Sequence, residues 1–161
     1  MGELILREIQ EKDNAEVAML IREILVDMGV PKVGTAYEDK ALDAMYQEYN
    51  KPRSRYFVAE KDNHILGCAG IAPLQNAEED ICELQKMYVS KDSRGQGVAQ
   101  QLISACLKVS KTFGFSSCYL ETMPYMNAAQ GLYKKNGFEF IQERMGDTGH
   151  YSCPVFMIKH L

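Results

Sequence analysis

The sequence predicts a mixed α/β fold whose sheet contains both hairpins and crossover connections. Segments with strand character and segments with helical periodicity follow one another in the order β α α β β β α β α β β. The polar run Lys61–His64 between the second and third strands is a short turn, which indicates a hairpin. This mixed order excludes a uniformly doubly wound sheet.

The expected strands are short runs rich in apolar residues and bounded by turn residues. They cover residues 4–9, 56–60, 65–71, 81–89, 117–122, 138–141 and 154–159. The last of them could serve as the edge strand of a dimer.

Four helices are expected over residues 15–28, 38–49, 98–113 and 128–135. Asp13 or Asn14 offers an N-cap for the first helix. The third helix has the clearest pattern, with apolar residues at 98, 102, 105, 106, 109 and 113. The pair Asn136–Gly137 ends the fourth.

Length and composition indicate one domain over residues 1–161, without nucleic-acid or membrane partners. A formal net charge of −4 argues against the basic field that nucleic acids require. No apolar run is long enough to span a bilayer, and the first residues lack the pattern of a secretory signal. Five cysteines without Cys-x-x-Cys spacing are typical of reduced thiols, so we expect a cytoplasmic protein.

The segment from Val89 to Ala99 predicts a binding site for a phosphate or pyrophosphate. A strand leads into a loop with Gly95 and Gly97, and the loop opens the third helix, whose first N–H groups have no partner within the helix. The glycines have no Cβ, so a ligand can approach the backbone closely. Arg94 adds a cation, and the helix dipole adds a partial positive charge.

Two common phosphate-binding motifs do not fit this loop. A Walker A motif requires Gly-Lys-Ser/Thr, but Val98 and Ala99 follow the second glycine. A dinucleotide-binding motif requires a small residue where Gln100 stands, and it opens a repeated βαβ fold. A glycine turn that caps a helix without any ligand is the structural alternative.

Three segments together resemble the GNAT superfamily of acetyl-CoA-dependent N-acetyltransferases. They are Glu83–Val89, the Arg94-x-x-Gly97-x-Ala99 loop, and Asn127–Phe138 with its Leu-Tyr-x-x-x-Gly-Phe pattern. The resemblance implies the GNAT fold: a mostly antiparallel sheet of about seven strands with about four helices. In this fold the fourth strand is bulged and splays from the fifth.

The resemblance also implies how acetyl-CoA would bind. Pantetheine would pair with the backbone of Met87 and Val89 like an added strand. Asn127 and Tyr133 would line the opposite wall. The pyrophosphate would lie on the N–H groups of one run of residues, namely Arg94, Gly95, Gln96, Gly97, Val98 and Ala99.

The same resemblance implies roles in direct transfer of the acetyl group to an amine within a ternary complex. Glu83 is the candidate general base, directly or through a water, and Glu121 is the rival carboxylate. The N–H of Met87 would bind the thioester oxygen. Tyr133 would protonate the departing thiolate. Without the resemblance, Tyr133 would be a packed aromatic residue and Glu83 a solvent-facing strand residue.

The acceptor region is expected in the loops 29–35, 123–126 and 145–153. There, His150 could orient the acceptor or simply bond to its own turn. The pair His150 and Cys153 lacks further ligands at suitable spacing, so no metal is expected.

The predicted function is therefore acetyl transfer from acetyl-CoA to a primary amine of a small molecule or peptide. The sequence leaves open the identity of the amine and whether the chain is a monomer or a homodimer. The alternative is a non-catalytic acyl-CoA-binding sensor on the same fold.

Overall fold

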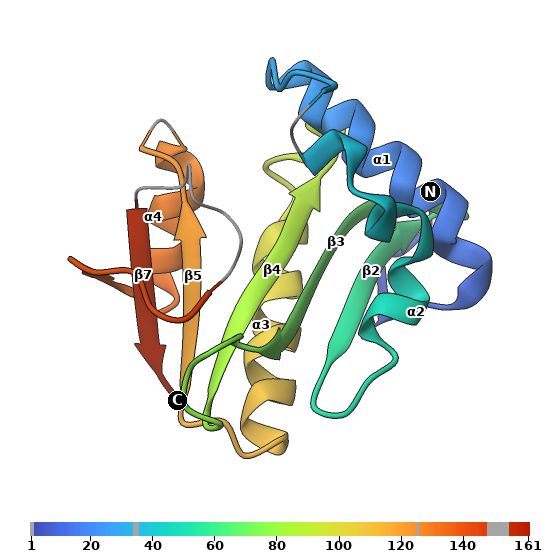
Figure 1. Ribbon diagram of the computed structural model, residues 1–161. Helices are drawn as coiled ribbons and strands as arrows, with labels where there is room; N and C mark the ends of the chain where they lie inside the picture. The colour runs from blue at the N-terminus through green and yellow to red at the C-terminus, as the bar shows by residue number, and fades with distance from the viewer. Residues whose placement is uncertain (1, 34–35, 125, 148–154) are drawn as a thin grey trace.

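The computed structural model describes residues 2–33, 36–124, 126–147 and 155–161. Its strands form one seven-stranded sheet in the order β1-β2-β3-β4-β5-β7-β6 (Figure 1). The strand bounds are β1 Ile5–Glu8, β2 Arg55–Lys61, β3 His64–Pro73, β4 Ile81–Val89, β5 Ser117–Thr122, β6 Glu139–Ile141 and β7 Val155–His160. The seven predicted strands and their order along the chain are thus confirmed.

In the described part of the chain, four α-helices and four short 3-10 helices connect the strands. The α-helices are α1 Asn14–Asp27, α2 Met45–Tyr49, α3 Val98–Thr112 and α4 Asn127–Lys135. The 3-10 helices are η1 Glu11–Asp13, η2 Ala36–Glu38, η3 Lys40–Ala44 and η4 Lys91–Ser93. Within the described ranges, no helix combines the length and apolar character that a bilayer span requires.

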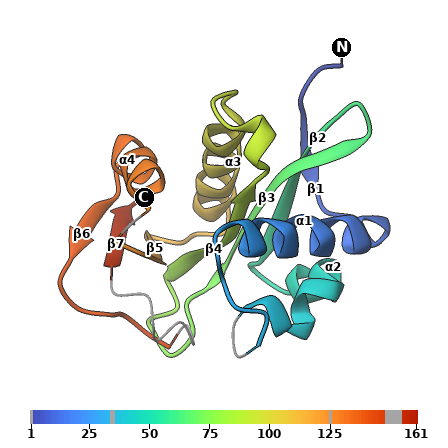
Figure 2. The same ribbon diagram turned by 90° about the horizontal axis from the view of Figure 1, so that it is seen from above.

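The helices cover the two faces of the sheet, with α1 and α2 on one side and α3 and α4 on the other (Figure 2). Residues of α1 and α2, such as Ile21 and Met45, pack with Val58 of β2. On the opposite face Leu102 of α3 and Tyr133 of α4 share a core with the inward side chains of β4, β5 and β7. Each face of the sheet therefore has its own apolar core.

Asp13 precedes α1 as expected, but its side chain does not cap that helix. Its carboxylate accepts a bond from the backbone N–H of Gln10 and pairs with the Arg7 guanidinium at 2.8 Å. The expected side-chain cap at Asp13 was therefore wrong. An arginine 6 residues earlier gives the buried carboxylate a charged partner, which a helix N–H does not.

The single helix expected over residues 38–49 is wrong as well, because three shorter segments replace it. Asp39 has an extended backbone and its carboxylate accepts a bond from the N–H of Ala41, which starts η3. Ala44, with φ of −139°, then leaves the helical region before α2 begins. The break brings Tyr49 at the end of α2 onto the sheet, where it stacks on Tyr56.

The order of the last strands differs from a simple meander. Strand β7 lies between β5 and β6, and it pairs antiparallel with both. The last strand is therefore internal and cannot serve as a dimer edge. The three residues of β6 occupy that edge instead.

Candidate functional site

Strands β4 and β5 pair only at their beginnings and then separate. They are the one parallel pair among the described strands, and the paired register runs from Ile81 opposite Ser117 to Glu83 opposite Tyr119. Beyond Glu83 the two strands diverge, as Figure 1 shows. The six later residues of β4 therefore have no strand partner on this side, and their backbone can pair with an extended ligand.

A β-bulge in β4 lies within this separated part. On β3, Cys68 pairs with Tyr88 and Gly70 with Gln85, so Lys86 and Met87 together face the single residue between them. Lys86 has a positive φ of 47°, which is uncommon for a residue with a Cβ. The Tyr56 hydroxyl, from β2, donates a bond of 2.7 Å to the Lys86 carbonyl and holds this conformation.

The bulge changes which side chains share a face of β4. Regular alternation would place Met87 on the same face as Glu83. Instead Met87 and Val89 pack with the core beneath α3, together with Leu84. The bulged and splayed β4 that the resemblance implied is therefore present.

The loop before α3 forms an open cradle of backbone N–H groups. Gly95 and Gly97 both have φ of 79°, and no heavy atom lies within 4 Å of a Cβ built on either. No side chain caps the helix at Gly97, and the first turn of α3 carries no acidic residue. Arg94 is exposed at the same place. The space beside Gly95 and Gly97 is open, whereas the N–H of Arg94 donates to the Lys91 carbonyl, so it is the other N–H groups of the loop and the dipole that can act on an anion.

Glu83 is the last residue of β4 that pairs with β5, and its side chain is buried rather than facing solvent. It is 3% exposed. Gln85 donates a bond of 2.6 Å from Nε2 to its Oε1. Burial, together with the smaller effect of the Glu121 charge, raises the pKa of Glu83 to about 7, although the bond from Gln85 acts in the opposite direction. A carboxyl group with such a pKa can accept a proton near neutral pH.

Glu121, the rival carboxylate on β5, is already engaged by two neighbours. Its Oε2 accepts a bond of 2.6 Å from the Tyr119 hydroxyl and lies 3.2 Å from Nε of Arg144. The side chain is fully buried in this arrangement. The hydroxyl and the guanidinium both contact the same oxygen of this carboxylate. The structure therefore brings Glu121 near Glu83 as a charged neighbour and gives the two different environments.

Tyr133 lies on α4, on the face of the sheet opposite Glu83. It is 8% exposed, and its ring meets Phe138 edge-on with 5.9 Å between centroids. Burial raises the pKa of its hydroxyl to about 12, so the phenol is protonated at neutral pH. Asn127, the first residue of α4, is exposed. Glu83 and Tyr133 therefore lie on opposite faces of the sheet, and β4 and β5 separate just beyond Glu83.

Several residues of this site have no distinctive sequence signal. Tyr49 hydrogen-bonds Gln85, Tyr56 holds the bulge, and Arg144 pairs with Glu121. Gln85 could have been found, because it is two residues from Glu83 on one strand and so shares its face. The tyrosines and the arginine come from other elements, and no spacing in the sequence points to them.

Two expectations concern residues that the structure describes only in part or not at all. His150 lies outside the described residues, as do parts of the three expected acceptor loops. Among the residues that are described, no group of three or more His, Cys, Asp or Glu side chains could hold a metal ion.

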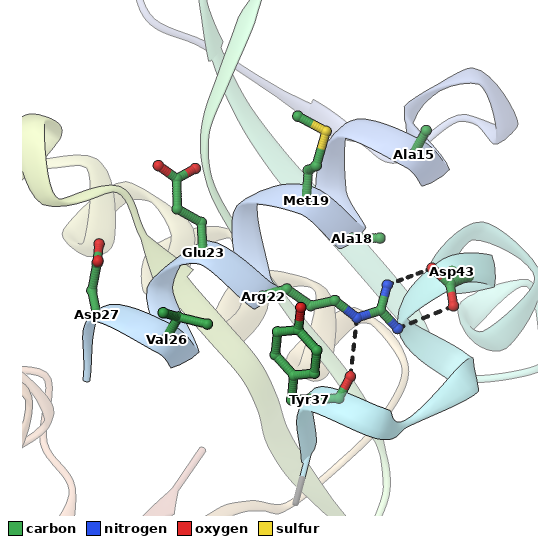
Figure 3. Close-up of a pocket in the computed structure, with 9 residues that line it drawn as sticks. All are labelled: Ala15, Ala18, Met19, Arg22, Glu23, Val26, Asp27, Tyr37 and Asp43. Atoms are coloured by element: carbon green, nitrogen blue, oxygen red, sulfur yellow. Dashed lines mark hydrogen bonds and ion pairs between the residues drawn. The ribbon is translucent and has the colours of Figure 1, made fainter. Parts of the chain in front are cut away.

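A hollow of about 490 Å³ lies elsewhere, on the outer side of α1 (Figure 3). Arg22 crosses it to the Asp43 carboxylate and to the Tyr37 carbonyl, with bonds of 3.0 Å to each. The exposed side chains of Met19 and Val26 line its outer part. None of its nine lining residues belongs to the site at β4 and β5.

Comparison with known proteins agrees with this geometry. The family described as Acetyltransferase (GNAT) family matches residues 19–138. The uncharacterized N-acetyltransferase YjgM of Escherichia coli is 39% identical over 158 residues, which cover 98% of this chain and 95% of that protein.

Two solved structures share the fold at low identity. A GNAT-family acetyltransferase of Staphylococcus aureus superposes with a TM-score of 0.85 at 20% identity, over 99% of both chains. A phosphinothricin acetyltransferase of Sinorhizobium meliloti, solved in complex with AcCoA, gives a TM-score of 0.79 at 18% identity, over 98% of this chain and 88% of that one. The splayed strands, the bulge, the glycine cradle and the family match lead to one conclusion: the chain belongs to the GNAT family of N-acetyltransferases.

Proposed function

We propose that this chain transfers an acetyl group from acetyl-CoA to a primary amine of a small molecule or peptide. The observation that carries the proposal is the buried carboxyl of Glu83 at the point where β4 leaves β5. A proton acceptor with a pKa of about 7 is what an attacking amine requires, since the amine is protonated at neutral pH.

Acetyl-CoA would bind along the separated part of β4. The open cradle at residues 94–99 would hold its pyrophosphate, since the space beside Gly95 and Gly97 is open and the side chain of Arg94 is exposed. The pantetheine amides would pair with the free edge at Met87 and Val89. The AcCoA complex of the phosphinothricin acetyltransferase, which has the same fold, supports this ligand.

The transfer step would be direct. Glu83 first takes a proton from the ammonium group, through a water because its side chain is buried, and the neutral nitrogen then attacks the thioester carbonyl carbon. The N–H of Met87 beside the bulge would stabilise the negative oxygen. The carbon–sulfur bond then breaks, the thiolate receives a proton from the Tyr133 hydroxyl, and the proton that the amide nitrogen loses restores that hydroxyl. That hydroxyl is protonated at neutral pH, as the reaction requires.

A cytoplasmic enzyme is consistent with the thiols. Cys68, Cys82, Cys106 and Cys118 are all free and buried, with no disulfide among them. A reducing compartment maintains cysteines in this state.

The test is release of free CoA from acetyl-CoA with a panel of amino acids, polyamines, aminated drugs and peptides. We expect turnover with at least one amine class. The variant Tyr133→Phe should reduce kcat about 10- to 100-fold and leave the Kd for acetyl-CoA unchanged by calorimetry. Tight binding of acetyl-CoA without turnover by any amine would instead support the acyl-CoA sensor. Absence of acetyl-CoA binding would overturn both.

A further inference from the structure

A chain of short hydrogen bonds connects α2 to Glu83. The hydroxyl of Tyr49, the last residue of α2, donates to Oε1 of Gln85 at 2.6 Å. Gln85 in turn donates from Nε2 to Oε1 of Glu83, also at 2.6 Å. Residues of α2 and β4, 36 positions apart in the sequence, thus meet on one face of β4.

The direction of these bonds matters because the Gln85 carbonyl oxygen can only accept. While the Tyr49 hydroxyl donates to that oxygen, the amide nitrogen must point to Glu83. An N–H donor aimed at a carboxylate stabilises its ionised form. The Tyr49 ring is fixed for this purpose, because it is buried and stacks on Tyr56 with 4.7 Å between centroids.

We propose that Tyr49 and Gln85 are positioning residues, which hold the Glu83 carboxylate in place and ready to accept the proton of the amine. This inference rests on the proposed function in one respect only, namely that Glu83 is the base. Neither residue needs to touch the substrate, since both act through the Glu83 side chain.

Other charged and titratable groups around Glu83 also act on its pKa. Glu121 from β5 raises the pKa of Glu83, and Lys86 from β4 lowers it. Tyr119 lies opposite Glu83 in the register of β5, and its hydroxyl is occupied by Glu121. The bond from Gln85 is the largest influence that lowers the pKa of Glu83, against the effect of burial. Without an oriented Gln85, that pKa should rise above 7.

The first test compares Tyr49→Phe with Tyr46→Phe. Tyr46 lies on the same helix and is half-buried, and its backbone N–H rather than its hydroxyl bonds Asn14. We expect Tyr49→Phe to move the acidic limb of the pH profile of kcat/KM upward by about one pH unit. Activity would then fall about fivefold near pH 7 and be almost normal near pH 9. The control Tyr46→Phe should keep the wild-type profile.

A structural role would give a different result. If Tyr49→Phe lowers kcat/KM by the same factor at every pH, or leaves the profile unchanged, the proposal is overturned. The melting temperature of Tyr49→Phe should fall by only about 2–4 °C, as expected for one lost hydrogen bond in a domain of this size.

A second variant tests the chain of bonds as a unit. Gln85→Met removes both hydrogen bonds while it keeps the length of the side chain. We expect it to shift the acidic limb at least as far as Tyr49→Phe does. The double variant should shift the limb no further than Gln85→Met alone, since Tyr49 acts only through Gln85. Additive shifts would contradict this arrangement.

A direct titration separates this inference from the proposed function. The carboxyl carbon of Glu83 is assigned by NMR as the signal lost in Glu83→Gln, and it is then followed from pH 4 to 10. An upward shift of its midpoint in Tyr49→Phe supports the positioning role even if no amine is acetylated. An unchanged midpoint overturns the role, whatever the activity of the enzyme.

Discussion

The two faces of β4 differ sharply in chemistry although they belong to one strand of nine residues. Toward α2 the strand presents Glu83 and Gln85, which form a buried polar chain with Tyr49. Toward α3 it presents apolar and thiol side chains, namely Cys82, Leu84, Met87 and Val89.

The difference shows how a single strand can serve two requirements of acyl transfer. A proton acceptor needs oriented hydrogen-bond partners, because an unpaired buried carboxylate would be costly. A long, mostly uncharged pantetheine arm needs backbone amides beside apolar side chains. The bulge at Lys86 and Met87 follows Glu83, the proposed base, at the start of the edge that we propose for pantetheine.

The largest expected effect concerns the polar face. We expect Glu83→Gln to lower kcat/KM about 10²–10⁴-fold at pH 8, because the amide cannot accept a proton. Its Kd for acetyl-CoA should stay within about twofold, since the cradle and the binding edge lie elsewhere on β4 and α3. Steady-state kinetics and calorimetry measure the two quantities.

The control for this experiment is Glu79→Gln, which removes one exposed negative charge just before β4. It should leave kcat/KM near the wild-type value. Equal losses in both variants would mean that overall charge matters and not the carboxyl of Glu83. Retained activity in Glu83→Gln would transfer the role of base to another group or to solvent.

Glu83→Gln, which should lower activity, should raise the stability of the fold. Because the pKa of Glu83 is raised to about 7 in the folded protein, the native state keeps this carboxyl protonated up to a higher pH than the unfolded state does. The free energy of unfolding therefore falls as the pH rises from about 4.5 to 7. We expect Glu83→Gln to raise it by about 1–3 kcal/mol at pH 8, and to leave it nearly unchanged at pH 4. Urea unfolding at the two pH values measures this. A gain that is equal at both values would rule out the ionisation as its cause.

The proposed anion site can be tested with a matched pair of glycine variants, one at each end of α3. Gly97→Ala and Gly114→Ala both place a Cβ at a positive φ, 79° and 85°, with no heavy atom within 4 Å. Both variants should lose about 1 kcal/mol of stability through backbone strain. Only Gly97→Ala should weaken acetyl-CoA binding, by about tenfold, because Gly114 lies at the far end of α3. Equal affinities in isothermal titration would exclude the cradle as the pyrophosphate site.

The smallest expected effect concerns the bulge between the two faces. Tyr56→Phe removes the hydroxyl that holds the Lys86 carbonyl. We expect a loss of about 0.5–1.5 kcal/mol in the free energy of unfolding, together with faster hydrogen exchange at the amide of Met87. Unchanged exchange at Met87 would mean that β3 alone maintains the bulge.

The two faces also differ in how far the sequence could predict them. The cradle depends on residues close together in the sequence, and the strand–loop–helix pattern with Arg94, Gly95, Gly97 and Ala99 is enough to predict it as an anion site. Glu83 was proposed from the family resemblance, but its hydrogen-bond partner Gln85, and Tyr49 behind it, were not foreseen. Tyr49 lies 36 positions from Gln85, and only the broken helix before it brings the two together. Long-range contacts of this kind leave no periodic signal in a single sequence.

Because of the bulge, β4 can contain one residue more than the stretch of β3 with which it pairs. The bulge absorbs Lys86 as this additional residue, and alternation resumes after it. A chain that lacked Lys86 would keep the remaining side chains of β4 on the helix faces they have now. What it would lose is the bulge, and with it the local bend that a bulge gives to a strand. Shape and side-chain content of this strand can therefore be varied one at a time, by removing a single amino acid.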